Sequence, residues 1–225
     1  MTDPDHAEPH AYRQELPPPP RRIAKLPLDE RGFPVPWFVS WFDGKPDFRV
    51  VAPERVIIAH RRKLCWVCGD PLGAHKAFVI GPMCVINRVS SEPPSHRECA
   101  EYAAAACPFL SKPRMRRNDK DLPEKKMVPG IMIARNPGVT SVWLTRSYRL
   151  FRVDNGVLFE IGEPDEVHFY CEGRPARRAE VEASVASGLP LLEAQARRDI
   201  DVRGALAALA TQIMRAEPIF AAVPQ

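Results

Sequence analysis

Residues Leu64–Leu110, LCWVCGDPLGAHKAFVIGPMCVINRVSSEPPSHRECAEYAAAACPFL, decide the fold that this sequence predicts. Within them, Cys65 and Cys68 form a C-x-x-C pair, and His96 and Cys99 form an H-x-x-C pair further along. Three thiolates and one imidazole make a ligand set that suits tetrahedral Zn²⁺. The stretch therefore predicts that these four side chains hold one structural zinc ion per chain.

The second ligand pair is expected at the start of a helix. Ser95 and Glu98 have the spacing of a capping box, with Ser95 at the N-cap and Glu98 at N3, and an alanine-rich run follows. That frame places His96 and Cys99 three residues apart in the first turn, where their side chains share one face. The positive end of the helix dipole also favours a thiolate at this position.

The segment between the two ligand pairs is predicted to be a β-hairpin, with strands at 77–80 and 83–88 and a turn at Gly81-Pro82. A C-x-x-C knuckle, a hairpin and a helix that supplies the second ligand pair together resemble a treble-clef zinc finger. The resemblance covers 64–110, and it implies a zinc-binding scaffold rather than a particular activity.

Three further cysteines lie outside this ligand set. Cys84 falls between apolar neighbours in the expected second strand, which favours a buried thiol, and it is the alternative ligand if His96 does not coordinate. Cys107 lies two helical turns beyond Cys99, too far along the axis to share the metal. Cys171 is expected to be a core thiol in a later strand.

The composition is that of a globular protein, with 45% hydrophobic and 27% charged residues. No apolar run is long enough for a transmembrane helix, and the start of the sequence, MTDPDHAEPH, lacks the regions of a signal peptide. We therefore expect a cytoplasmic protein without a membrane partner. In that compartment cysteines serve more often as metal ligands and buried thiols than as disulfides.

Changes in composition along the chain predict an α+β protein of four parts. They are a disordered proline-rich leader at 1–22, a β-hairpin plus zinc module at 23–110, a basic proline-containing linker at 111–138, and an antiparallel sheet with C-terminal helices at 139–225. Nothing in the sequence indicates the oligomeric state.

The second part should begin with a β-hairpin. Strands are expected at 37–42 and 48–51, with a turn at Asp43-Gly44, and Pro53 can open the helix that leads to the knuckle.

The fourth part should begin with a meander of strands at 142–144, 148–153, 157–161 and 166–171, including a hairpin turn at Asn155-Gly156. Three helices should follow, at 175–187, 190–198 and 202–216, with Gly188 ending the first of them.

Two basic segments are candidates for contact with nucleic acid, although the net charge is only +4. The candidate residues are Arg61, Arg62, Lys63, Lys112, Arg114, Arg116 and Arg117. The alternative is that the first cluster complements a helix dipole and the second is a solvated charge run.

The sequence favours a binding or accessory protein over an enzyme. A zinc ion with four protein ligands has no open position for a substrate. The enzyme alternative is an HNH-like metal-dependent nuclease with His75 and Asn87 in the hairpin, but the D-H or H-H pair of that family is missing. The partner is expected to be nucleic acid or a protein, and the aromatic residues Trp37, Phe38 and Trp41 of the first hairpin are candidates for a protein contact.

Overall fold

The computed structural model describes residues 11–52, 54–112, 129 and 137–225. It has mixed helix and strand content, which confirms the α+β prediction. Its strands are β1 (Val39–Phe42), β2 (Lys45–Val51), β3 (Lys76–Ile80), β4 (Val89–Ser90), β5 (Thr140–Thr145), β6 (Tyr148–Val153), β7 (Gly156–Ile161), β8 (Pro164–Cys171) and β9 (Arg174–Pro175). Its α-helices are α1 (Arg55–Arg62), α2 (Pro82–Asn87), α3 (Arg97–Ala106), α4 (Pro108–Ser111), α5 (Arg178–Ala196) and α6 (Val202–Ala221).

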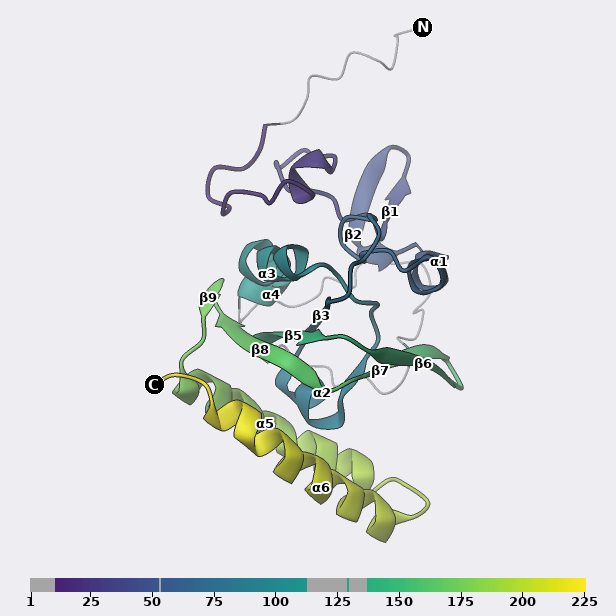
Figure 1. The fold of residues 1–225 in the computed structure, drawn as a ribbon, viewed down its shortest axis with the longest axis vertical. Helices are drawn as coiled ribbons and strands as arrows, with labels where there is room; N and C mark the ends of the chain where they lie inside the picture. Colours follow the sequence, from purple (N-terminus) through teal and green to yellow (C-terminus); the bar gives the residue numbers. More distant parts are fainter. Residues whose placement is uncertain (1–10, 53, 113–128, 130–136) are drawn as a thin grey trace, which may run out of the picture.

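The centre of the fold is an antiparallel sheet in the order β3-β5-β8-β9 (Figure 1). Every residue of β5 is buried, because helices cover both faces of this central strand. Val142 and Leu144 face α3, while Trp143 faces α2, α5 and α6, as the alternation of side chains along a strand requires. A second sheet, β4-β7-β6, and the separate hairpin β1-β2 complete the strands.

The alanine-rich run of α3 explains how closely that helix lies on the sheet. Ala100 and Ala104 are buried against Ala77, Val142 and Leu144. The opposite face of the sheet carries the larger core, in which Phe78 and Trp143 are almost completely buried. This part of the molecule therefore has three layers: α3 on one face of the central sheet, the sheet itself, and α2, α5 and α6 on the other face.

The predicted hairpin between the two ligand pairs is wrong in its second half. Residues Pro82–Asn87 form helix α2, and β3 pairs with β5 instead. Pro82 stands at the first helical position, where a proline is favoured because its missing N–H is not needed. A short apolar run does not by itself distinguish a buried strand from a buried helix, and here its Met83, Val85 and Ile86 fill the main core.

The first hairpin and the four strands predicted after residue 139 are confirmed, but these four strands do not form one sheet of their own. β5 and β8 pair in the central sheet, whereas β6 and β7 pair in the second sheet. Asp43 and Gly44 both have positive φ values, 48° and 75°, as the tight turn between β1 and β2 requires. The turn between β6 and β7 lies one residue earlier than predicted, at Asp154-Asn155, since Val153 pairs with Gly156. Cys171 is a buried core thiol, as expected.

The prediction that Gly188 ends a helix is wrong, because α5 continues from Arg178 to Ala196 through Gly188 and Pro190. The glycine has a packing role instead. A Cβ atom at this position would lie 2.6 Å from Sδ of Met83 in α2. The third predicted helix is confirmed as α6, and its Leu209 and Ile213 pack on the main core.

Residues 11–22 differ from the expected disordered leader, because the structure places them against Gly32, Tyr102 of α3 and Asp70 in the loop of residues 65–71, the knuckle loop. The Tyr12 and Tyr102 hydroxyls lie 2.5 Å apart, and the Arg13 amide donates to the Gly32 carbonyl at 3.1 Å. Arg22 then pairs with Asp70 at 2.9 Å. The composition of residues 11–22 does not predict these contacts, which hold the segment in a defined position.

Strands from both sides of the 111–138 segment lie in one sheet. β3 precedes that segment and β5 follows it, yet the two strands pair over five residues each. The division of the chain into separate parts at 111–138 stays a prediction. Among the described helices, none has the length and apolar character needed to cross a membrane.

Candidate metal centre

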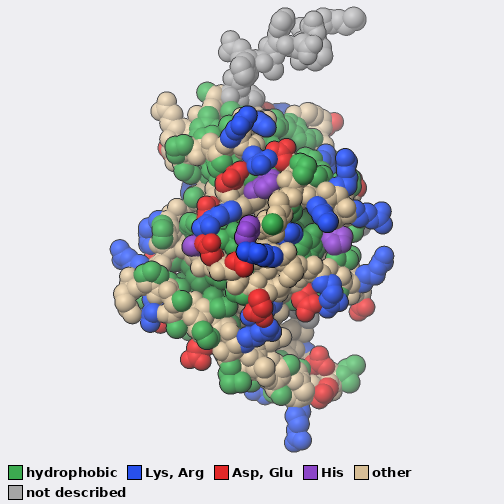
Figure 2. Space-filling model, in the orientation of Figure 1, with side chains coloured by type: hydrophobic (Ala, Val, Ile, Leu, Met, Phe, Trp, Pro, Cys, Tyr) green, Lys and Arg blue, Asp and Glu red, His purple; other side chains and the backbone are tan. Residues whose placement is uncertain are grey.

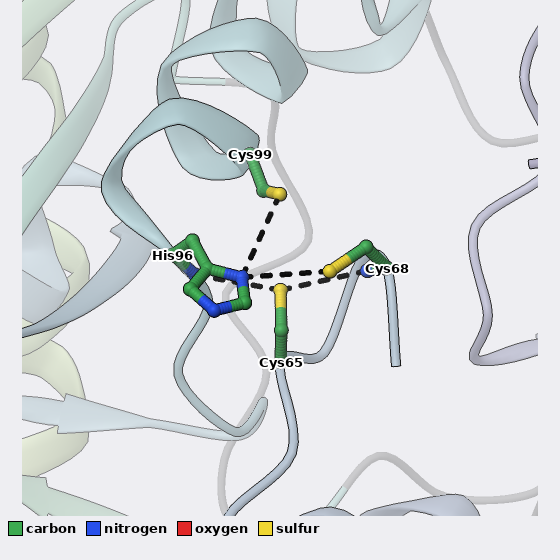
Figure 3. A group of neighbouring side chains, drawn as sticks. All are labelled: Cys65, Cys68, His96 and Cys99. Carbon is green, nitrogen blue, oxygen red and sulfur yellow. Dashed lines mark hydrogen bonds between the residues drawn. The ribbon is translucent and has the colours of Figure 1, made fainter. Parts of the chain in front are cut away.

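The first ligand pair lies on a tight loop between α1 and β3. The Cys65 amide donates to the Asp70 carbonyl at 2.8 Å, and the Gly69 amide donates to the Cys65 carbonyl at 2.9 Å. Gly69 has a φ of +77°, a conformation that favours glycine. These bonds turn the backbone so that both cysteine side chains point to the same side (Figure 3).

The second pair lies at the start of α3, but one residue out of the predicted frame. The helix begins at Arg97 with His96 as its N-cap, so the capping box is wrong. Ser95 instead exchanges two backbone hydrogen bonds with Ala77, at 2.7 and 2.9 Å. The side chain of Glu98 pairs with Arg22 at 3.0 Å rather than capping the helix. The bridge to Ala77 holds Ser95 in an extended conformation and delays the helix start.

The four predicted ligand side chains converge (Figure 3). Their ligand atoms all lie within 4.8 Å of one another. Nδ1 of His96 lies 3.4 Å from Sγ of Cys68 and 3.9 Å from Sγ of Cys99. Bond lengths of about 2.3 Å to sulfur and about 2.0 Å to nitrogen imply ligand separations of roughly 3.5–3.8 Å around tetrahedral zinc. The group can therefore hold a metal ion, and its size and donor set are compatible with zinc.

The orientation of His96 is fixed by a second bond. Its Nε2 lies 3.0 Å from the Pro71 carbonyl oxygen. A carbonyl only accepts, so Nε2 carries the proton and Nδ1 keeps a free lone pair directed at the cysteine sulfurs. This is the arrangement by which a backbone carbonyl orients a metal-binding histidine.

The local electrostatics favour a thiolate at Cys65. Burial would raise the pKa of Cys65, but hydrogen bonds, the largest from Cys68 and the next from Cys99, lower it below the usual range. The backbone amides of Cys68 and His96 also point at the Cys65 sulfur, at 3.5 and 3.4 Å.

The centre is shielded by apolar neighbours. Cys65 and Cys99 are fully buried and pack with Ile23 and Val67. Cys68 and His96 are partly exposed, so a metal ion can reach the group from that side. With four protein ligands, a tetrahedral ion here would have no open position, which is the character of a structural site.

The remaining cysteines do not join the group. In the described parts of the chain, the Cys65, Cys68, His96 and Cys99 group is the one cluster of three or more potential ligands that could hold a metal. Cys84 lies in α2 and packs against the main core. Cys107 ends α3 and is followed by α4.

The residues of the nuclease alternative are not arranged as a second metal site. His75 is exposed just before β3, with its Nδ1 atom 3.4 Å from Asp165. Asn87 ends α2 and accepts a hydrogen bond from the Val89 amide. Neither residue belongs to a potential ligand group within the described ranges.

The basic candidates are only partly described. Arg61, Arg62 and Lys63 are exposed at the end of α1, and Lys112 is exposed after α4. The other three, Arg114, Arg116 and Arg117, lie outside the described residues.

The aromatic candidates of the first hairpin divide into two groups. Phe38 stacks on Trp66 with ring centroids 4.7 Å apart, and Trp37 lies under the Arg55 guanidinium at 4.2 Å. These two rings are therefore engaged within the fold. Trp41 is 46% exposed and Phe42 is 49% exposed, which leaves them on the surface.

Sequence reasoning missed the residues that support the ligands. Pro71 orients His96 through its carbonyl, which no side-chain pattern reveals. Arg22 bridges Asp70 in the knuckle loop and Glu98 in α3, from a position more than forty residues away in sequence. The proximity of Asp70 to a C-x-x-C pair was the only available indication of such a partner.

Fold and site define an α+β protein with a Cys₃His group that could hold a metal ion. None of the protein-family models, curated proteins and solved structures compared with this chain matches it. The resemblance to a treble-clef zinc finger therefore remains one of ligand spacing and helix placement.

Proposed function

We propose that this chain is a non-enzymatic, zinc-stabilised binding or accessory protein that contacts nucleic acid through its basic segments. The observation that carries the proposal is the closed ligand group, in which His96 is oriented by Pro71 and Cys65 is fully buried. Zinc held in this way cross-links the knuckle loop to α3 and contributes folding free energy rather than chemistry.

The distribution of charge supports a local rather than a general electrostatic contact. On the face shown in Figure 2, acidic and basic side chains are interspersed, and neither sign dominates. About half of the described arginines, among them Arg22, Arg97 and Arg149, are paired with carboxylates. The end of α1 carries three consecutive, exposed cations, Arg61, Arg62 and Lys63, and none of them forms an ion pair with another described residue. Such a cluster suits a polyanion.

The enzyme alternative has less support. An HNH-like nuclease needs a general base beside a catalytic metal ion. His75 lies beside a single carboxylate, that of Asp165, at the surface.

The test is a titration of fluorescently labelled single- and double-stranded oligonucleotides at two salt concentrations, with zinc content measured on the same protein. We expect one zinc per chain and sequence-tolerant binding. With about five phosphate contacts, the slope of log affinity against log salt should be roughly −3.5 for a single strand. Absence of binding at low salt would favour a protein partner for the exposed hairpin residues Trp41 and Phe42. Metal-dependent cleavage of the probe that is lost in His75→Ala would establish the enzyme alternative.

A further inference from the structure

An open pocket lies beside the metal centre, between α1 and the knuckle loop. Its volume is about 560 Å³. The residues that line it are Trp37, Glu54, Arg55, Ile58, Arg62, Leu64, Gly69 and Pro71. The pocket thus joins the basic helix, the first hairpin and the loop that carries two of the metal ligands.

The periodicity of α1 directs two arginines into this pocket. Arg55, Ile58 and Arg62 are three and seven residues apart, so they share one face of the helix. The opposite side of the helix is attached to the protein, with Ala59 buried and Val56 packed on the main core. This packing fixes the rotation of α1 about its axis, so that Arg55 and Arg62 stay directed toward the pocket.

Arg55 is held in position by Trp37. Its guanidinium carbon lies 4.2 Å from the centre of the indole ring, a cation–π contact. Trp37 is itself fixed, since its amide donates to the Val67 carbonyl at 2.7 Å and its ring lies against Gly69. A stacked guanidinium keeps its N–H edge available for an acceptor, and little side-chain entropy remains to be lost on binding.

Neither Arg55 nor Arg62 forms an ion pair with another residue that the structure describes. Two unneutralised guanidinium groups that line one pocket are an attractive site for an oxyanion, because the planar fork of each matches two phosphate oxygens. Glu54 also lines the pocket, so the ionised lining carries two positive charges and one negative charge. That balance suits the single charge of a phosphodiester better than the nearly double charge of a terminal phosphate.

We infer that this pocket binds a phosphodiester group of a nucleic-acid backbone, with Arg55 and Arg62 as its ligands. The inference rests on the proposed function and locates the contact. Arg61 and Lys63 flank Arg62 and are exposed, so the positive charge continues beyond the pocket along the end of α1. An extended polyanion can contact Arg61 and Lys63 as well as the pocket, whereas a small free phosphate reaches only the pocket.

The pocket is also coupled to the metal centre. Gly69 donates its amide to the Cys65 carbonyl, and the Pro71 carbonyl accepts from His96. Both residues form part of the pocket wall. Loss of the metal should therefore disorder this wall and weaken phosphate binding, although no pocket side chain is a metal ligand.

The test uses the full zinc-loaded chain and fluorescence anisotropy of a labelled single-stranded oligonucleotide. Arg55→Gln and Arg62→Gln should each weaken binding about tenfold, the lower end for loss of a charge-assisted hydrogen bond. Each should also reduce the salt slope by about 0.7, the value for one phosphate contact on a single strand. Zinc content of both variants should match that of the parent protein, and loss of the cation–π contact should lower the unfolding temperature of Arg55→Gln by no more than a few degrees. Arg55→Lys should not restore full affinity, because an ammonium cannot replace a stacked, forked guanidinium.

Arg203→Gln is the matched control for loss of one exposed positive charge. Arg203 is exposed near the start of α6, which lies at the bottom of the view in Figure 1, well below α1. This variant should bind as the parent does. If Arg55→Gln, Arg62→Gln and Arg203→Gln all weaken binding equally, general charge explains the effect and the pocket is not the site.

The source of the phosphate is distinguished by competition. An unlabelled oligonucleotide should displace the probe at micromolar concentration, and a nucleoside monophosphate should not do so even at millimolar concentration. Equal competition by the mononucleotide would overturn the assignment to a backbone phosphodiester. Unchanged affinity in Arg55→Gln and Arg62→Gln would overturn the pocket and leave the proposed function intact. A parent protein that binds no oligonucleotide would remove nucleic acid from the proposed function as well.

Discussion

Nε2 of His96 donates a hydrogen bond to the carbonyl oxygen of Pro71 at 3.0 Å. The bond selects the tautomer whose Nδ1 lone pair faces Cys68 and Cys99. It also connects the two halves of the centre, because Pro71 belongs to the knuckle loop and His96 precedes α3. The orientation of His96 therefore depends on a backbone carbonyl, whose position is set by the conformation of the knuckle loop.

The first prediction concerns the metal ligands. Cys68→Ser or Cys99→Ser should remove the bound zinc and destabilise the protein by several kcal/mol, because the metal cross-link between the loop and α3 is lost. Mass spectrometry under native conditions and urea unfolding measure the two effects. Cys84→Ser is the matched control and should keep the zinc. Zinc retained in His96→Ala but lost in Cys84→Ser would replace His96 by Cys84 in the ligand set.

The second prediction concerns pH. Arg174 binds both carboxylate oxygens of Glu180, at 3.0 and 2.6 Å, and the Arg177 amide adds a third bond at 2.8 Å. These bonds, with that of Arg174 the largest, lower the pKa of Glu180 to about 2. A carboxylate with a lowered pKa stabilises the folded state above its unfolded pKa, near 4.5, and loses that contribution as pH falls toward 2.

Glu180→Gln should therefore cost roughly 1 kcal/mol at neutral pH, a small value because the pair is near the surface and screened by solvent. The cost should decline as pH falls from about 4.5 to about 2, where both proteins carry a neutral side chain. Urea unfolding of the variant and the parent at each pH gives this difference, and any loss of zinc in acid affects both proteins alike. A cost that does not change with pH would show that the carboxylate charge is not responsible.

The sequence was sufficient for those parts of the fold that depend on local pattern. The ligand spacing predicted the Cys65, Cys68, His96 and Cys99 group, and Asp43-Gly44 predicted the first hairpin turn. Alternation predicted the strands β5 to β8, although not their division between two sheets. The hairpin turn and the strands depend on residues close together in the chain, and the Cys/His group follows the spacing that a shared metal ion would require.

Features that depend on distant partners were not predictable. Residues Pro82–Asn87 are apolar enough for a strand or a helix, and the choice follows from the pairing of β3 with β5, sixty residues later. Arg55 and Arg62 line one pocket together with Trp37, which lies more than fifteen residues earlier in the sequence and stacks under Arg55. Pairing and packing across the chain, rather than local preference, decided each of these outcomes.

The third prediction concerns Gly188. In an ordinary exposed helix, replacing glycine by alanine stabilises the fold by about 1 kcal/mol. Here the added Cβ would lie 2.6 Å from Sδ of Met83, so Gly188→Ala should instead destabilise the protein by about 1–3 kcal/mol. Thermal or urea unfolding shows whether the free energy of unfolding falls or rises in Gly188→Ala. In the background Met83→Ala, which removes the clashing sulfur, the same substitution should become neutral or stabilising. A stabilising effect in the parent background would mean that the methionine side chain moves away without cost.

The last prediction concerns Gly69, where two constraints coincide. Its φ is +77°, and a Cβ atom would lie 2.7 Å from Cγ and Cδ1 of Trp37. Two other glycines separate these constraints. Gly44 has a φ of +75° but nothing within 4 Å of its Cβ position, and Gly73 has neither a positive φ nor a contact.

Gly73→Ala should therefore leave stability unchanged, and Gly44→Ala should cost about 1 kcal/mol from backbone strain alone. Gly69→Ala should cost more than both, because it adds a collision with a ring that is fixed between Arg55 and the knuckle loop. Zinc affinity measured by competition with a chromophoric chelator should fall in Gly69→Ala and stay at the parent value in the other two variants. Equal costs for Gly44→Ala and Gly69→Ala, with zinc affinity intact, would mean that Trp37 can yield and that the loop does not depend on it. A fall in zinc affinity confined to Gly69→Ala would show that the packing of Trp37 on the knuckle helps to hold the ligands.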